Sequence, residues 1–328
     1  MKGKLLDWSF RYGALVVIAG VFVFFSIANE NFLTYDNIAD ILRSISIVTF
    51  IAIGVTLSQI VDGFDLSVGS TVSLSTVAAA TLMVWFEQPL IVVLVVPIAI
   101  GALIGLLNSL LIIRFRIPDL LATLAVMYII GGVQKTYTKG YAIYNNMQMT
   151  DGTKAPGKFS ESFKWIGQGE LLGIPVPVLL MLLAVVLVHL FLKYTRWGRQ
   201  MYITGGNREA ARLSGIRINR VRLAAYVLSG CFAAIGGILF AARVGSGQID
   251  AGAPLLMESV AAVFVGFSVL GAGKPNVIGT FLGAVLIGVL LNGLTMLNLP
   301  YYAFDIIKGV VLVLALAVTF VHLNRRRV

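Results

Sequence analysis

Residues 90–113 read LIVVLVVPIAIGALIGLLNSLLII, and this stretch decides the fold class. It contains no charged side chain. It is also longer than the roughly 20 mostly apolar residues that an α-helix needs to cross the hydrocarbon core of a bilayer. The segment is therefore predicted to be a transmembrane helix.

Apolar stretches of the same character lie on both sides of this segment, so the chain is predicted to cross the membrane about ten times. Two of them, 120–134 and 257–270, are short and are expected to be tilted, broken or partly buried helices, which leaves eight to ten crossings. The ten segments are 12–28, 38–61, 66–86, 90–113, 120–134, 175–192, 221–244, 257–270, 277–296 and 303–323.

The composition excludes a water-soluble protein. Hydrophobic residues make up 58% of the 328 residues, and charged residues only 12%, which is about half the usual share of charged residues. A soluble domain of this size needs far more polar side chains to cover its surface, and a disordered chain needs low hydrophobicity. The predicted fold class is an all-α, polytopic bundle of transmembrane helices.

Lysine and arginine residues set the predicted orientation, because they gather on the cytoplasmic side of membrane proteins. With the N-terminus inside, most of these residues fall in cytoplasmic segments, which predicts cytoplasmic termini and an even number of crossings. Two polar segments stand out, an outside loop at 135–174 and a strongly basic cytoplasmic loop at 193–220. Neither is long enough for a separate enzymatic domain, so residues 1–328 are predicted to form a single membrane domain.

The sequence offers no catalytic or metal site. Cys231 is the one cysteine, and His189 and His322 lie far apart, whereas metal sites need clustered ligands. Residues 271–275 (GAGKP) fail the phosphate-loop motif, because Ser268 stands where its first Gly belongs and Pro275 where its Ser or Thr belongs. No metal and no cofactor is expected in this chain.

A few polar and aromatic residues within the apolar segments are candidates for a substrate pathway. Residues 61–70 (VDGFDLSVGS) hold two carboxylates and two glycines between apolar runs. Ionisable groups at membrane depth tend to be functional, although Ser67 or Asp65 capping an ordinary helix end is the simpler interpretation. Asparagines in apolar helices either bond across helices or line a polar path, and a phenylalanine pair either packs within the bundle or stacks on a ring of the substrate. The candidates are Asp65, Asn108, Phe264, Phe267 and Asn292.

The basic cytoplasmic loop carries a short helix signal. Asn207 is suited to cap a helix, Glu209 falls in its first turn, and Gly215 is suited to end it. A helix of about two turns is marginal alone, so we expect it to be ordered by a partner or by the membrane face. The simpler interpretation is a basic helix at the membrane interface.

This loop resembles a known family. Glu209-Ala210-Ala211-x-x-x-Gly215 is similar to the EAA motif of ABC-importer permeases. The Gly-Gly-Asn at 205–207 and the Ser-Gly-Ile at 214–216 resemble its ribose/xylose/arabinose/galactose branch, as do DGFDLSVGS at 62–70 and the Gly-rich stretch 265–283. The resemblance covers nearly the whole chain. One departure is the absence of proline in residues 217–220, where the wider motif ends in Ile-x-Leu-Pro.

The resemblance implies a sugar-importer permease in a bacterial plasma (inner) membrane. Two permease subunits would form the pathway, an extracytoplasmic binding protein would deliver a monosaccharide, and a separate ATPase carrying ATP and Mg would dock on the cytoplasmic loop. The resemblance assigns ATPase coupling to Gly205, Gly206, Asn207, Glu209, Ala210, Ala211 and Gly215.

An ion-gradient-driven secondary transporter is the alternative. Residues 101–110 resemble residues 283–294 on a helix predicted to run in the opposite direction, and inverted repeats are common in transporters. A shared bias toward Gly, Ala and Leu explains the likeness equally well. Most apolar segments lack a carboxylate, which disfavours proton coupling. The sequence leaves open which sugar is carried and whether the second permease subunit is the same chain or a paralogue.

Overall fold

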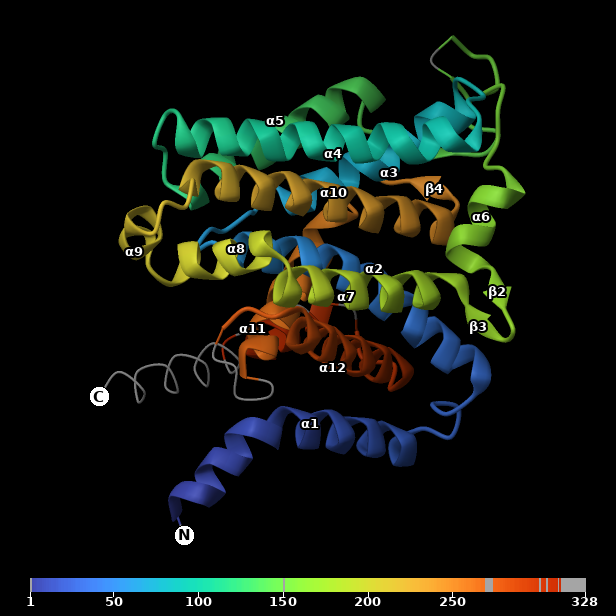
Figure 1. Cartoon of the computed structure of the whole chain (residues 1–328). Helices are drawn as coiled ribbons and strands as arrows, with labels where there is room; N and C mark the ends of the chain where they lie inside the picture. Colours follow the sequence, from blue (N-terminus) through green and yellow to red (C-terminus); the bar gives the residue numbers. More distant parts are fainter. Residues whose placement is uncertain are drawn as a thin grey trace.

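The structure is a computed structural model that describes residues 2–149, 151–268, 274–300, 302–304, 306–311 and 313. Its regular structure is almost entirely helical, and the long helices lie side by side (Figure 1). They are α1 (Lys2–Ala28), α2 (Tyr35–Ile60), α3 (Val68–Val84), α4 (Leu90–Ile113), α5 (Asp119–Thr138), α7 (Val176–Tyr194), α10 (Ile218–Val244), α11 (Gly252–Ser268) and α12 (Val277–Met296).

Membrane crossing is supported for most of the predicted segments. Seven of these helices are long and apolar enough to span a bilayer, namely α2, α3, α4, α5, α7, α10 and α12. The segment predicted at 120–134 is not short, because α5 continues to Thr138 and has 20 residues. The segment predicted at 257–270 begins earlier, at Gly252, and is helical as far as Ser268, the last described residue before Lys274. Most of 303–323 lies outside the described residues.

Proline marks the start of three long helices. Pro89, Pro118 and Pro175 each occupy the N-cap position, of α4, α5 and α7 respectively. The lack of an N–H group at proline costs nothing there, because the first amides of a helix have no partner within the helix. At the other end, Lys139 after α5 and Gly245 after α10 adopt left-handed backbone conformations that end these helices.

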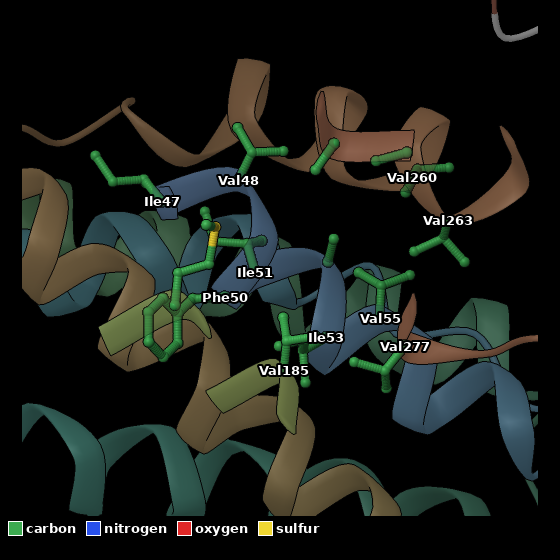
Figure 2. Packing of buried hydrophobic residues seen from close by; sticks show 14 of the residues in the cluster. Ile47, Val48, Phe50, Ile51, Ile53, Val55, Val185, Val260, Val263 and Val277 are labelled. Atoms are coloured by element: carbon green, nitrogen blue, oxygen red, sulfur yellow. The ribbon is translucent and has the colours of Figure 1, made fainter. Parts of the chain in front are cut away.

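Helix α2 forms the centre of the bundle. Its apolar side chains point in all directions, toward α7, α11 and α12 among others (Figure 2). A helix that is hydrophobic on every side is a buried one. By contrast, only 28% of the best spanning window of α4 and 22% of that of α5 is buried, so these two helices present much of their surface to the surroundings.

Helix α10 packs against α2, α3 and α4, and its contacts fix the direction of its neighbours. Gly54 and Ile51 of α2 lie against Ser229 and Gly236 of α10, and Gly101 and Gly105 of α4 lie against Gly230 and Tyr226. Helices α2 and α4 therefore both run antiparallel to α10. Helix α12 runs antiparallel to α2, since Thr280 bonds to Thr56 and Gly288 faces Ile45. Helices α4 and α12 thus run in opposite directions, as the repeat hypothesis requires.

The short elements gather at the two ends of the bundle (Figure 1). The predicted outside loop 135–174 starts later than expected, after Lys139, and holds more structure than turns alone. Strand β1 (Ile143–Tyr144) pairs antiparallel with β4 (Ser246–Gly247), and β2 (Glu170–Leu171) pairs with β3 (Ile174–Pro175). Helix α6 (Glu161–Gln168) is capped by Ser160. The opposite end carries α8 (Arg196–Gly206) and α9 (Arg208–Leu213).

Candidate functional site

The predicted short helix of the basic loop is α9. The side chain of Asn207 caps it, because the amide oxygen accepts a hydrogen bond from Ala210 N at 3.0 Å. Gly215 follows its end with φ +75°, a conformation that suits glycine. Glu209 and Arg212 form an exposed ion pair at 2.6 Å. Six residues make less than two helical turns, so α9 depends on its surroundings for order.

Helix α9 is attached to the link at residues 61–67, which joins α2 to α3. Arg208, its first residue, donates hydrogen bonds to the Asp62 carboxylate at 3.1 Å and to the Asp62 backbone oxygen at 2.9 Å. Gly205 lies so close to Ile60 O that an added Cβ would overlap this oxygen. The α8–α9 segment therefore contacts both the link and the end of α2.

Helix α8 was not predicted, and it changes the placement of two candidate residues. Gly205 and Gly206 form its last turn rather than a free turn before α9. The hydroxyl of Tyr202 donates to Pro275 O at 3.0 Å, and burial raises the pKa of this tyrosine. Of the Ala-Ala pair, Ala211 is fully buried in this chain while Ala210 is exposed. The outward surface of α9 is thus formed by Glu209, Ala210 and their neighbours.

The link contains a buried carboxylate that joins three helices. Asp65 is 1% exposed. It accepts hydrogen bonds from Ser67 N at 3.0 Å, Ser67 Oγ at 2.6 Å and Ser229 Oγ at 2.8 Å. Asn108 of α4 donates to Ser67 Oγ at 2.7 Å. The predicted capping of α3 is wrong for Ser67, whose side chain bonds Asp65 instead of a helix amide. We call Asp65, Ser67, Asn108 and Ser229 the link cluster.

A buried ion pair lies beside the link. Arg222 of α10 donates to both oxygens of Asp119, the first residue of α5, and the Tyr226 hydroxyl donates to the same carboxylate. Gly63 lies against both Tyr226 and Asp119. In the sequence, Arg222 falls at the start of the predicted span 221–244. The signal for this ion pair in the sequence was one acidic and one basic residue, Asp119 and Arg222, each near the start of an apolar segment.

The remaining pathway candidates lie elsewhere. Asn292 donates to Asn37 Oδ1 at 2.9 Å, which is a bond between α12 and α2. Phe264 and Phe267 face each other in α11, with ring centroids 5.2 Å apart. The structure therefore brings Asp65 and Asn108 together, pairs Asn292 with Asn37, and pairs Phe264 with Phe267. Within the described residues, no three His, Cys, Asp or Glu side chains are placed to hold a metal ion.

We expect Asp65→Asn to lower the free energy of unfolding by about 1–3 kcal/mol, because one of the donors around this carboxylate would lose its acceptor while buried. Asp151 provides the control, since it accepts the same pair of hydrogen bonds, from Thr153 N and Oγ, in an exposed loop. Asp151→Asn should change stability by less than about 0.5 kcal/mol. Thermal unfolding of the detergent-purified chain measures both. Equal effects would mean that the link cluster adds nothing to stability.

Comparison with known proteins gives one family and a set of relatives. Residues 37–316 match the family described as branched-chain amino acid transport system / permease component. The ribose import permease protein RbsC of Escherichia coli K12 is 34% identical over 311 residues, or 95% of this chain and 94% of that protein. Its namesake in Bacillus subtilis is 35% identical over 290 residues, or 88% and 86%.

A third relative is named for a different sugar. The galactose/methyl galactoside import permease protein MglC of Escherichia coli K12 is 31% identical over 328 residues, or 96% of this chain and 95% of that protein. No solved structure matches the chain significantly.

Proposed function

The chain belongs to the family of branched-chain amino acid transport system permease components, and from this we propose that it is the membrane-spanning subunit of an ATP-driven importer of a monosaccharide. It is a transport subunit and not an enzyme. A sugar substrate is supported over a branched-chain amino acid by relatives that match nearly the whole chain and are named for ribose and galactose import. The same names support the importer over an ion-gradient-driven transporter.

The proposed assembly has several parts. The chain lies in a bacterial plasma membrane with both termini in the cytoplasm, crosses it ten times as a single domain, and pairs with a second permease subunit. A binding protein outside the cell delivers a ribose-type pentose or a related hexose. Separate ATPase subunits, which hold the ATP and Mg, dock on the cytoplasmic face at α9. This orientation is supported by the arginines that surround α8 and α9 at one end of the bundle.

The observation that carries the proposal is the attachment of α9 to the link. A docked ATPase that moves α9 pulls on Asp62 through Arg208, and it pushes on Ile60 where Gly205 of α8 lies against it. The link leads into α3, and the link cluster connects the link to α4 and α10. Motion at a six-residue helix therefore reaches the start of α3, the last turns of α4 and the middle of α10. Among the pathway candidates, Asp65 and Asn108 then lie at the inner exit for the sugar.

Glu209→Arg and Gly215→Arg should each lower ATP-dependent sugar uptake at least about tenfold, which corresponds to about 1.4 kcal/mol of coupling free energy. The first change places a positive charge at a helix N-terminus and removes the ion pair with Arg212. The second strains the left-handed turn after α9. Uptake of ribose, galactose and leucine into vesicles containing the whole importer provides the measurement.

Gly173→Arg is the matched control for this experiment. Gly173 resembles Gly215 in two respects: its φ is +76°, and an added Cβ would meet no atom within 4 Å. It lies, however, at the opposite end of the bundle. The control should insert and transport normally. Wild-type uptake with normal ATPase association in both α9 variants would overturn the coupling assignment. Uptake of leucine and not of either sugar would overturn the substrate assignment.

A further inference from the structure

A basic pocket lies beside α9, between the connection from α4 to α5 and the start of α10. Its volume is about 360 Å³, and Arg116, Arg208 and Arg222 line it together with Asn219. Asp119 is the one acidic residue in the lining. Three guanidinium groups around one carboxylate leave the pocket positively charged.

The arginines of this pocket are only partly neutralised by the protein. Arg222 is paired with Asp119, and Arg208 with Asp62. Arg116 has no ion-pair partner among the residues that the structure describes. The guanidinium of Arg222 lines the pocket. Its Nε atom is buried and has no hydrogen-bond acceptor within the described part of the chain, so Asp119 does not satisfy all of its donors.

Two helix N-termini add to the positive potential. Helices α5 and α10 both begin at the pocket, and neither start is capped by a side chain. The first amides of a helix carry a partial positive charge and are ready donors to an anion. The pocket therefore combines arginines and helix starts, which together are suited to the oxygens of a phosphate group.

The surroundings of the pocket are apolar and face outward. Leu110, Phe115 and Leu120 are each at least half exposed next to it, and α4 and α5 are the spanning helices with the lowest buried shares. Such side chains fit lipid acyl chains. A phosphate with two acyl chains thus matches both parts of the site, whereas a soluble anion matches the pocket alone.

We propose that this pocket binds the phosphate of an anionic phospholipid. The head group of a zwitterionic lipid carries a positively charged ammonium beside its phosphate, and the pocket already has more positive than negative side chains. An anionic head group is therefore preferred. The assignment to the cytoplasmic leaflet rests on the orientation proposed above, but binding itself does not. The bound phosphate would join Arg208, the first residue of α9, to the starts of α5 and α10, and would thereby brace the segment on which the ATPase docks.

Lipid retention by the purified full-length chain tests the proposal. The chain is placed in nanodiscs made from equal parts of phosphatidylglycerol and phosphatidylcholine, released, and examined by native mass spectrometry for bound lipid. Wild type should retain phosphatidylglycerol in preference to phosphatidylcholine. Arg116→Gln with Arg208→Gln should reduce this retention at least about tenfold, since each arginine near a membrane surface contributes to the attraction. The single variant Arg116→Gln, at an exposed position, should reduce it severalfold and serves if the double variant folds poorly.

Arg217→Gln with Arg220→Gln is the matched control, because it removes the same charge from exposed positions that do not line the pocket. The control should retain the lipid. Equal retention by all variants would overturn the proposal, as would displacement of the lipid by millimolar inorganic phosphate, which would identify a free anion as the occupant. If the double variant retained the lipid but no longer co-purified with the ATPase, the pocket would be assigned to contact with that protein instead. None of these measurements depends on sugar transport, so a failure of the lipid proposal can be told apart from a failure of the proposed function.

Discussion

Gly105→Ala is expected to destabilise the protein by about 3 kcal/mol or more, although it adds only one methyl group. Helix α4 crosses α10 at Gly101 and Gly105, and a Cβ at Gly105 would overlap the carbonyl group of Tyr226. Because the obstacle is backbone, no side-chain rotation can relieve it, and the helices must separate. Overpacking in a tight core usually costs about 1–3 kcal/mol, and more where backbone must move. Small residues permit this close helix approach in membranes.

The experiment compares Gly105→Ala with Gly20→Ala, since an added Cβ at Gly20 meets no atom within 4 Å. The fraction of monodisperse protein and the unfolding midpoint in detergent should fall for Gly105→Ala alone. The shift of Tyr226 should also weaken its hydrogen bond to Asp119. Indistinguishable unfolding of the two variants would show that the α4–α10 crossing is not as tight as described.

Arg222→Met should lower the free energy of unfolding by about 3 kcal/mol. The guanidinium is the cationic partner of Asp119, and the two side chains are only 10% and 19% exposed. Removing one member of a buried ion pair leaves an uncompensated charge, which typically costs about 3–5 kcal/mol. We expect the lower end of this range, because neither side chain is completely buried.

Two further variants separate this cause from simple loss of an arginine. Arg212→Met removes an arginine from an exposed pair, whose members are 70% and 65% exposed, and should cost less than about 1 kcal/mol. Arg222→Met combined with Asp119→Asn should be more stable than Arg222→Met alone, because the stranded charge is gone. If the double variant were the less stable of the two, the stranded charge would not be the cause.

The sequence predicted the membrane segments well where an apolar run is bounded by clear signals. The predicted spans 90–113 and 277–296 coincide with α4 and α12. Helix α8 was missed because residues 196–206 contain three glycines, which are poor helix formers. Tertiary contact compensates: Gly198 lies tightly against Leu192, and Gly205 against Ile60. Intrinsic propensity carries no information about such contacts.

The candidate site was only partly predictable for a similar reason. The helix signals at Asn207 and Gly215 are local, and the structure has α9 between them. The link cluster joins Asp65 to Ser229, which is 164 positions away in the chain. A pattern along one segment indicates that a polar residue lies in an apolar setting, but not which distant residue will bond to it. Asn108, predicted to bond across helices or line a path, does bond across helices to Ser67.

Helix α10 is a long helix that its neighbours contact most closely near its middle. Its 27 residues span about 40 Å. The close crossings at Ser229 and Gly230 lie near the midpoint, while the two ends are tied to other elements by Arg222 and by β4. A tilt of α10 about these crossings would move its two ends in opposite directions. A displacement of the end of α10 that lies near α9 would therefore be accompanied by an opposite displacement of the end that lies near β4.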